Sequence, residues 1–133
     1  MTTNDITTGV TPEYPEIKPR QYPQSVETVY RVAGNSIRRM SRWKVASEEP
    51  AAWKVQAEAR TAVFGFTDDV TVWVEPQASG CRVMVRSHSR IGRGDLGENA
   101  RTIRALQREM DDALKREPIT PHKPGAPGTA AAE

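Results

Sequence analysis

The chain has very few of the side chains that metal binding and thiol chemistry require. Among its 133 residues, Cys81 is the single cysteine and there are two histidines. One cysteine cannot form an intrachain disulfide or a Cys-x-x-Cys pair. A metal site would have to depend on carboxylates, and the sequence has no Glu-x-x-His or Asp-x-Asp-x-Asp arrangement to hold one. We therefore expect no metal and no other cofactor.

Long apolar segments and a strong charge of either sign are also lacking. No stretch approaches the ~18 apolar residues that a membrane-spanning helix needs, and the amino-terminal segment has no secretory signal pattern. We therefore expect a soluble, cytoplasmic protein without a membrane segment. The 19 basic and 17 acidic residues leave a net charge of +2, which does not favour nucleic acid as a partner.

Two common catalytic motifs are missing. The sequence contains neither a Walker-type phosphate loop nor a Gly-x-Ser-x-Gly nucleophile elbow. Cys81 and His88 are an odd number of positions apart on one predicted strand, so they would face opposite sides of a sheet. That spacing excludes a local Cys–His nucleophile pair.

Proline and glycine mark both ends of the chain. Four prolines fall between residues 11 and 23 and impose an extended backbone there. Residues 1–22 are therefore predicted to form a disordered or extended arm. Residues 118–133 mix proline, glycine and alanine without apolar periodicity, which predicts a disordered tail. The segment between them, residues 23–117, is predicted to be a single globular domain.

Periodicity within this domain predicts a helix, four strands and a second helix. Ser25 is a suitable N-cap, and the apolar residues after it have helical spacing. The strands and the last helix are predicted at residues 43–47, 52–63, 70–75, 82–88 and 96–116. This order predicts an α+β fold, an antiparallel four-stranded meander sheet with two helices packed on one face (α-β-β-β-β-α), preceded by an extended Pro-rich arm.

Strand alternation divides the side chains between the two faces of this sheet. Valines from three strands share the face that the helices should cover. The other face receives Trp73 and Met84 among polar residues that include Arg86 and His88. We expect that second face to be an ordinary solvated face or one covered by the amino-terminal arm. The alternative is a mixed apolar and basic surface suited to a partner peptide, an acidic ligand or single-stranded nucleic acid.

Two motifs carry a family resemblance. The first is F-G-F-T-D-D-V at 64–70, and the second is S-R-I-G-R-G-D-L-G-E-N-A-R-T-I-R at 89–104. Together they resemble the bacterial and plastid family known as domain-of-unknown-function family 1499, over roughly Tyr14 to Leu114. The resemblance implies a fold and no activity.

The turn before the last helix has two interpretations. Asp95 can accept hydrogen bonds from the first N–H groups of the helix while Glu98 reaches back, as in a capping box. Alternatively, the glycines form a backbone nest in which Arg90, Arg93 and Arg101 hold a phosphate or carboxylate. The negative charge of Asp95 argues against the second interpretation, because Asp95 would occupy the same helix end.

The adjacent acids Asp68 and Asp69 also have two interpretations. Neighbours on a strand point to opposite faces, so one aspartate would stabilise the hairpin turn and the other would pair with an arginine. The alternative is a hydrolase-like enzyme that uses Asp68 or Asp69 with His88 as an acid–base pair.

We therefore expect a non-catalytic binding or protein-interaction module rather than an enzyme, with a protein or a small anionic ligand as its partner. The candidate binding residues are Arg90, Arg93, Asp95, Asn99, Arg101, Asp68 and Asp69.

Overall fold

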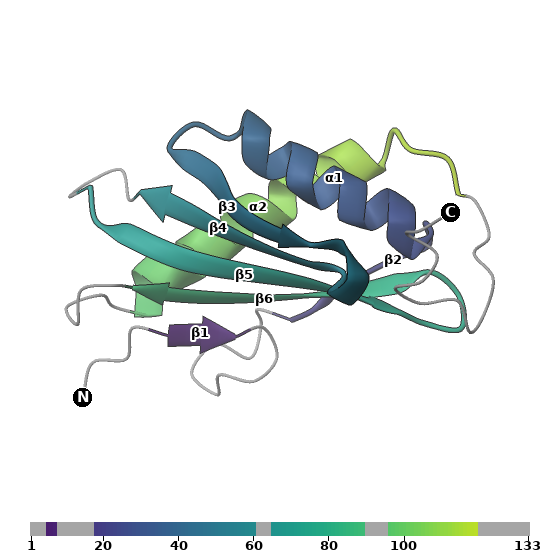
Figure 1. Ribbon diagram of the computed structural model, residues 1–133, viewed down its shortest axis with the longest axis horizontal. Helices are drawn as coiled ribbons and strands as arrows, with labels where there is room; N and C mark the ends of the chain where they lie inside the picture. Colours follow the sequence, from purple (N-terminus) through teal and green to yellow (C-terminus); the bar gives the residue numbers. More distant parts are fainter. Residues whose placement is uncertain (1–4, 8–17, 61–64, 90–95, 120–133) are drawn as a thin grey trace.

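The structure is a computed structural model, and it describes residues 5–7, 18–60, 65–89 and 96–119. Its elements, in chain order, are β1 (Asp5–Thr7), β2 (Arg20–Tyr22), α1 (Val26–Arg39), β3 (Trp43–Glu49), the 3₁₀ turn η1 (Pro50–Ala52), β4 (Lys54–Arg60), β5 (Thr67–Pro76), β6 (Cys81–Ser89) and α2 (Leu96–Leu114). Figure 1 shows one twisted sheet with both helices on the same side of it. The predicted α+β class is confirmed.

The sheet is larger than the predicted four-stranded meander. Its order is β1-β6-β5-β4-β3, β2 also pairs with β6, and every pair is antiparallel. The prediction missed β1, which lies in a segment without apolar periodicity, and β2, which lies in a segment dominated by prolines. A three-residue strand between Pro19 and Pro23 still pairs, since it needs few N–H groups to cover the open edge of β6.

Strand β5 begins earlier than predicted. The sequence predicts this strand from residue 70, but Thr67, Asp68 and Asp69 all belong to it and pair with β4. Strand β4 begins later than predicted. Trp53 lies between η1 and β4 and has a left-handed backbone conformation (φ 52°). The Trp53 ring is 4% exposed and meets Tyr30 edge-on at 5.4 Å between ring centroids, so this corner directs an aromatic ring into the core.

The core lies between the sheet and the two helices. Val55, Val72 and Val85 are register neighbours across three strands, and each is at most 1% exposed. Ile37 of α1 and Ile103 of α2 are fully buried in the same cluster. Burying a side chain of this size contributes about 1.5–3 kcal/mol, so this layer supplies most of the hydrophobic stabilisation.

Local signals position the helices and one hairpin. The predicted N-cap is confirmed, because Ser25 Oγ accepts a hydrogen bond from the Thr28 N–H at 3.3 Å. Gly80 has a φ of 78°, and a Cβ there would lie 2.1 Å from the Tyr22 carbonyl oxygen. Glycine is required at this hairpin because β2 passes so close to it. Neither described helix has the length and apolar character needed to cross a membrane.

Candidate functional site

A buried polar cluster joins β5, β6 and the start of α2. Asp68 is 1% exposed and points to the helix-covered face of the sheet. Its Oδ1 atom accepts a hydrogen bond from Ser89 Oγ at 3.0 Å, and its Oδ2 atom accepts one from Thr102 Oγ1 at 3.0 Å. Hydrogen bonds to a charged group contribute about 1.5–3 kcal/mol each, so Asp68 anchors the helix to the sheet.

Asn99 extends this cluster along β6. Its side chain is fully buried, and its Oδ1 atom accepts a hydrogen bond from Ser87 Oγ at 2.6 Å. Its Nδ2 group donates to Ser89 Oγ at 3.3 Å. We call Asp68, Ser87, Ser89, Asn99 and Thr102 the buried polar cluster. Because its hydroxyl and amide groups are hydrogen-bonded to one another inside the core, its chemistry is that of a structural network.

The two adjacent aspartates are separated by the sheet. Asp69 points to the face turned away from the helices, which we call the open face, and its register partners there are Glu58 and His88. The prediction that the aspartates face opposite sides is confirmed. The expected turn role is wrong, because both residues lie within β5. Asp68 and His88 therefore lie on opposite faces of the sheet, whereas Asp69 and His88 are register partners on the open face.

Of the other predicted binding residues, the structure describes Arg101 alone. Arg101 is exposed on α2. Arg90, Arg93 and Asp95 lie outside the described residues, so the choice between a capped turn and an anion site stays a prediction. Among the residues that the structure does describe, no three His, Cys, Asp or Glu side chains are grouped as metal ligands would be.

The glycines of the 89–104 motif have a spacing that is also found in dinucleotide-binding proteins. Gly92, Gly94 and Gly97 have G-x-G-x-x-G spacing, which in a parallel strand–helix–strand unit is typical of dinucleotide binding. The preceding strand, β6, pairs antiparallel with β5, β1 and β2. The spacing therefore does not have the structural context that a dinucleotide site needs.

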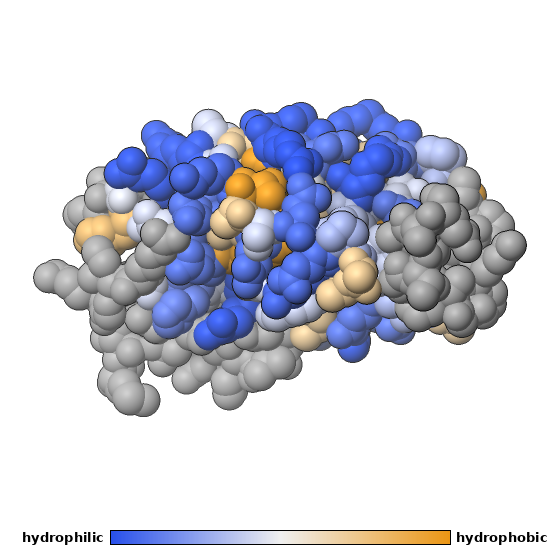
Figure 2. Space-filling model, in the orientation of Figure 1, coloured by the Kyte–Doolittle hydropathy of each residue, from blue (hydrophilic) through white to orange (hydrophobic). Residues whose placement is uncertain are grey.

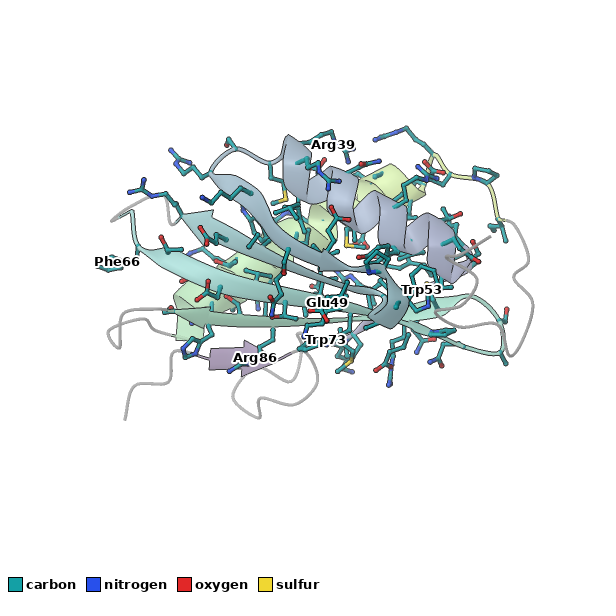
Figure 3. The ribbon with its side chains drawn as sticks, in the orientation of Figure 1. Arg39, Glu49, Trp53, Phe66, Trp73 and Arg86 are labelled. Carbon is teal, nitrogen blue, oxygen red and sulfur yellow. The ribbon has the colours of Figure 1, made fainter. Side chains whose placement is uncertain are left out.

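The open face carries the alternate strand side chains that point away from the helices. Figure 2 shows this side of the molecule as mostly hydrophilic, with only small apolar patches. One cross-strand row runs from Glu49 through Lys54 and Trp73 to Met84. Trp73 and Met84 are half-buried, and their predicted place on this face is confirmed. Figure 3 shows Trp73 between Glu49 and Arg86.

A groove of roughly 400 Å³ lies at one end of the sheet, where β3 begins, β4 ends and β5 begins. Its lining residues are Arg42, Trp43, Lys44, Glu58, Arg60 and Thr67. We call it the basic groove, since three of these side chains are cationic and one is acidic. The sequence motifs did not reveal it, because its parts meet only through the β3–β4 and β4–β5 registers.

The fold and these surfaces define a small α+β domain with a closed core face and an open, polar face. The chain belongs to the family described as "Protein of unknown function (DUF1499)", whose family model matches residues 1–110. The predicted family is therefore confirmed, and its description assigns no activity. No curated protein matches the chain.

Proposed function

We propose that this protein is a non-catalytic protein-interaction module that contacts its partner through the open face. One observation carries the proposal: Trp73 and Met84 are half-buried register neighbours on the central strands β5 and β6 of that face. Tryptophan, methionine and arginine are enriched at the centres of protein interfaces, where they bury large contact areas.

The charges around this apolar pair favour a protein partner. Lys54 Nζ lies 3.6 Å from Glu49 Oε2, and the Arg82 guanidinium donates to Glu75 Oε1 at 2.7 Å. Acids therefore stand beside the cations, and the phosphates of a nucleic acid would be repelled by them. A polar rim of paired charges around an aromatic centre is typical of protein–protein contacts.

A hydrolase using Asp68 or Asp69 with His88 has less support. Asp68 belongs to the buried polar cluster, and the basic groove is lined by none of these three residues. A catalytic site needs its acid, its base and a cavity for the substrate in one place. The binding interpretation needs only the surface that the open face supplies.

The test is a capture experiment with three versions of the chain. Wild-type protein, Trp73→Ala and Arg108→Ala are compared, Arg108 being an exposed residue of α2. We expect one partner to be captured from host extract by wild type and Arg108→Ala, and at least tenfold less by Trp73→Ala, because hot-spot truncation costs about 2 kcal/mol or more. Circular dichroism must show that the variants are folded.

Mapping the contact surface by photo-crosslinking then decides whether the capture supports the proposal. A photo-crosslinker at Thr71, a half-buried position of β5 on the open face, should label the captured protein, and one at Arg108 should not. Equal capture by Trp73→Ala, or labelling from α2 alone, would refute the open face as the contact surface.

A further inference from the structure

The basic groove brings together cations from two segments of the chain. Arg42 precedes β3, Lys44 lies within β3 and Arg60 ends β4. The Arg60 N–H donates to the Arg42 carbonyl oxygen at 2.9 Å, so the backbones of these two arginines are fixed as neighbours. Three cations against the single acid Glu58 leave this groove positively charged, unlike the paired charges elsewhere on the open face.

The three cations differ in the groups that their side chains already contact. Lys44 Nζ lies 3.5 Å from Glu58 Oε1, which neutralises it in part. The Arg60 guanidinium contacts the neutral carbonyl oxygen of Gly65 at 3.3–3.4 Å, which orients it without cancelling its charge. Within the described ranges, the guanidinium of Arg42 has no ion pair and no hydrogen bond. Two guanidinium charges are therefore available to a ligand.

The backbone at Arg42 is held in an unfavourable conformation. Its φ is 68°, in the left-handed region that glycine tolerates and other residues rarely adopt. Residues in such conformations persist only when the surrounding structure holds them, and they are often found at binding sites. A glycine here would relieve the strain but would remove the guanidinium from the groove.

We propose that the basic groove binds a small molecule that carries a carboxylate or phosphate group. Arg42 and Arg60 hold the anionic oxygens, since a guanidinium presents parallel N–H donors that match them. Thr67, the register partner of Arg60, adds a hydroxyl group, and Trp43 is a further lining residue. The groove volume of roughly 400 Å³ is within the range of small-ligand sites, about 300–1,000 Å³.

The experiment is an NMR titration of the full chain with inorganic phosphate and, separately, with succinate, each compared with sodium chloride at equal ionic strength. We expect saturable shifts of the amides of Arg42 and Arg60 and of the Trp43 indole N–H. Comparing the two titrations shows which anionic group the site prefers. Shifts that follow ionic strength alone, without saturation, would overturn the proposal.

Variants decide where the anion binds. Arg42→Gln should weaken binding about tenfold, the loss expected for one charge-assisted contact. The matched control Arg108→Gln should bind like wild type. Loss of binding in Arg93→Gln with normal binding in Arg42→Gln would place the anion at the 90–95 turn instead and overturn the proposal.

Arg42→Gly separates binding from folding. It should bind the anion at least tenfold more weakly while raising the melting temperature, because glycine adopts the positive φ without strain. Retained binding in this stable variant would overturn the proposal. Trp73→Ala should keep anion binding, so failure of the groove and failure of the open-face interaction are distinguishable.

Discussion

The adjacent aspartates provide a matched test of the buried polar cluster. Asp68 and Asp69 are neighbours in β5, yet one faces the core and the other faces the open side. The same conservative change, Asp→Asn, can therefore be made at both positions. Asn has nearly the shape of Asp, so the comparison measures the charge and its hydrogen bonds rather than a cavity.

The expected magnitude follows from the contacts of Asp68. Its carboxylate accepts hydroxyl groups from Ser89 and Thr102, both at 3.0 Å, and the residue is 1% exposed. An Asn side chain keeps one acceptor oxygen and replaces the other with a donor. One charge-assisted hydrogen bond is lost, which costs about 1.5–3 kcal/mol. Asp69→Asn should cost less than about 1 kcal/mol, as is usual for charges at the surface.

Thermal and urea denaturation followed by circular dichroism measure both variants. A loss of 1.5–3 kcal/mol lowers the melting temperature of a domain of this size by roughly 10 °C. Thr102→Val, which removes one donor to Asp68, should couple to Asp68→Asn in a double-mutant cycle, since the two residues share one contact. Equal losses at Asp68 and Asp69, or strict additivity with Thr102→Val, would refute the structural role of the cluster.

Four further predictions concern residues of α1, its cap, and the β5–β6 hairpin with the start of β6. Gly80→Ala should lower the free energy of unfolding by more than about 1 kcal/mol, because its Cβ would lie 2.1 Å from the Tyr22 carbonyl oxygen at a positive φ. Gly34→Ala, whose Cβ meets only the flexible end of Arg38 at 3.1 Å, should instead be neutral or stabilising by up to about 1 kcal/mol; urea midpoints compare the two. Ser25→Ala should cost about 0.5–2 kcal/mol in the same assay, by removing the cap of α1. Burial raises the pKa of the Cys81 thiol from 9.0 to about 12, so the unfolded chain releases a proton that the folded chain retains. Stability should therefore fall as pH rises above about 9, and less steeply in Cys81→Ala; urea midpoints that do not change between pH 7 and 10 would contradict this.

Much of the sheet could be predicted because alternation is a local property. Each strand residue points opposite to its neighbours, so the faces taken by Val72 and Trp73 followed from the sequence. The same reasoning failed where local signals conflict. Proline obscured β2, and the aspartates resembled turn residues although the pairing with β4 and β6 keeps them extended.

The candidate site was less predictable than the fold. Asp68 and Asn99 were singled out from the motifs, and the structure brings both into one cluster, but their hydroxyl partners could not be assigned. Thr102 is 34 positions from Asp68 in the chain, and their contact depends on how α2 packs across the sheet. The basic groove had no sequence signal, because single arginines at strand ends are common on solvated surfaces.

The sequence by itself determined the family, the α+β class, the faces taken by the residues of the predicted strands and the cap of α1, since these depend on motif spacing and on backbone geometry over a few residues. Only the tertiary structure decided which edge β1 and β2 cover, which hydroxyls reach Asp68, and that Arg42 and Arg60 lie side by side. Those outcomes depend on strand register and helix packing. They arise from the summed burial of many residues far apart in the chain, which no local pattern records.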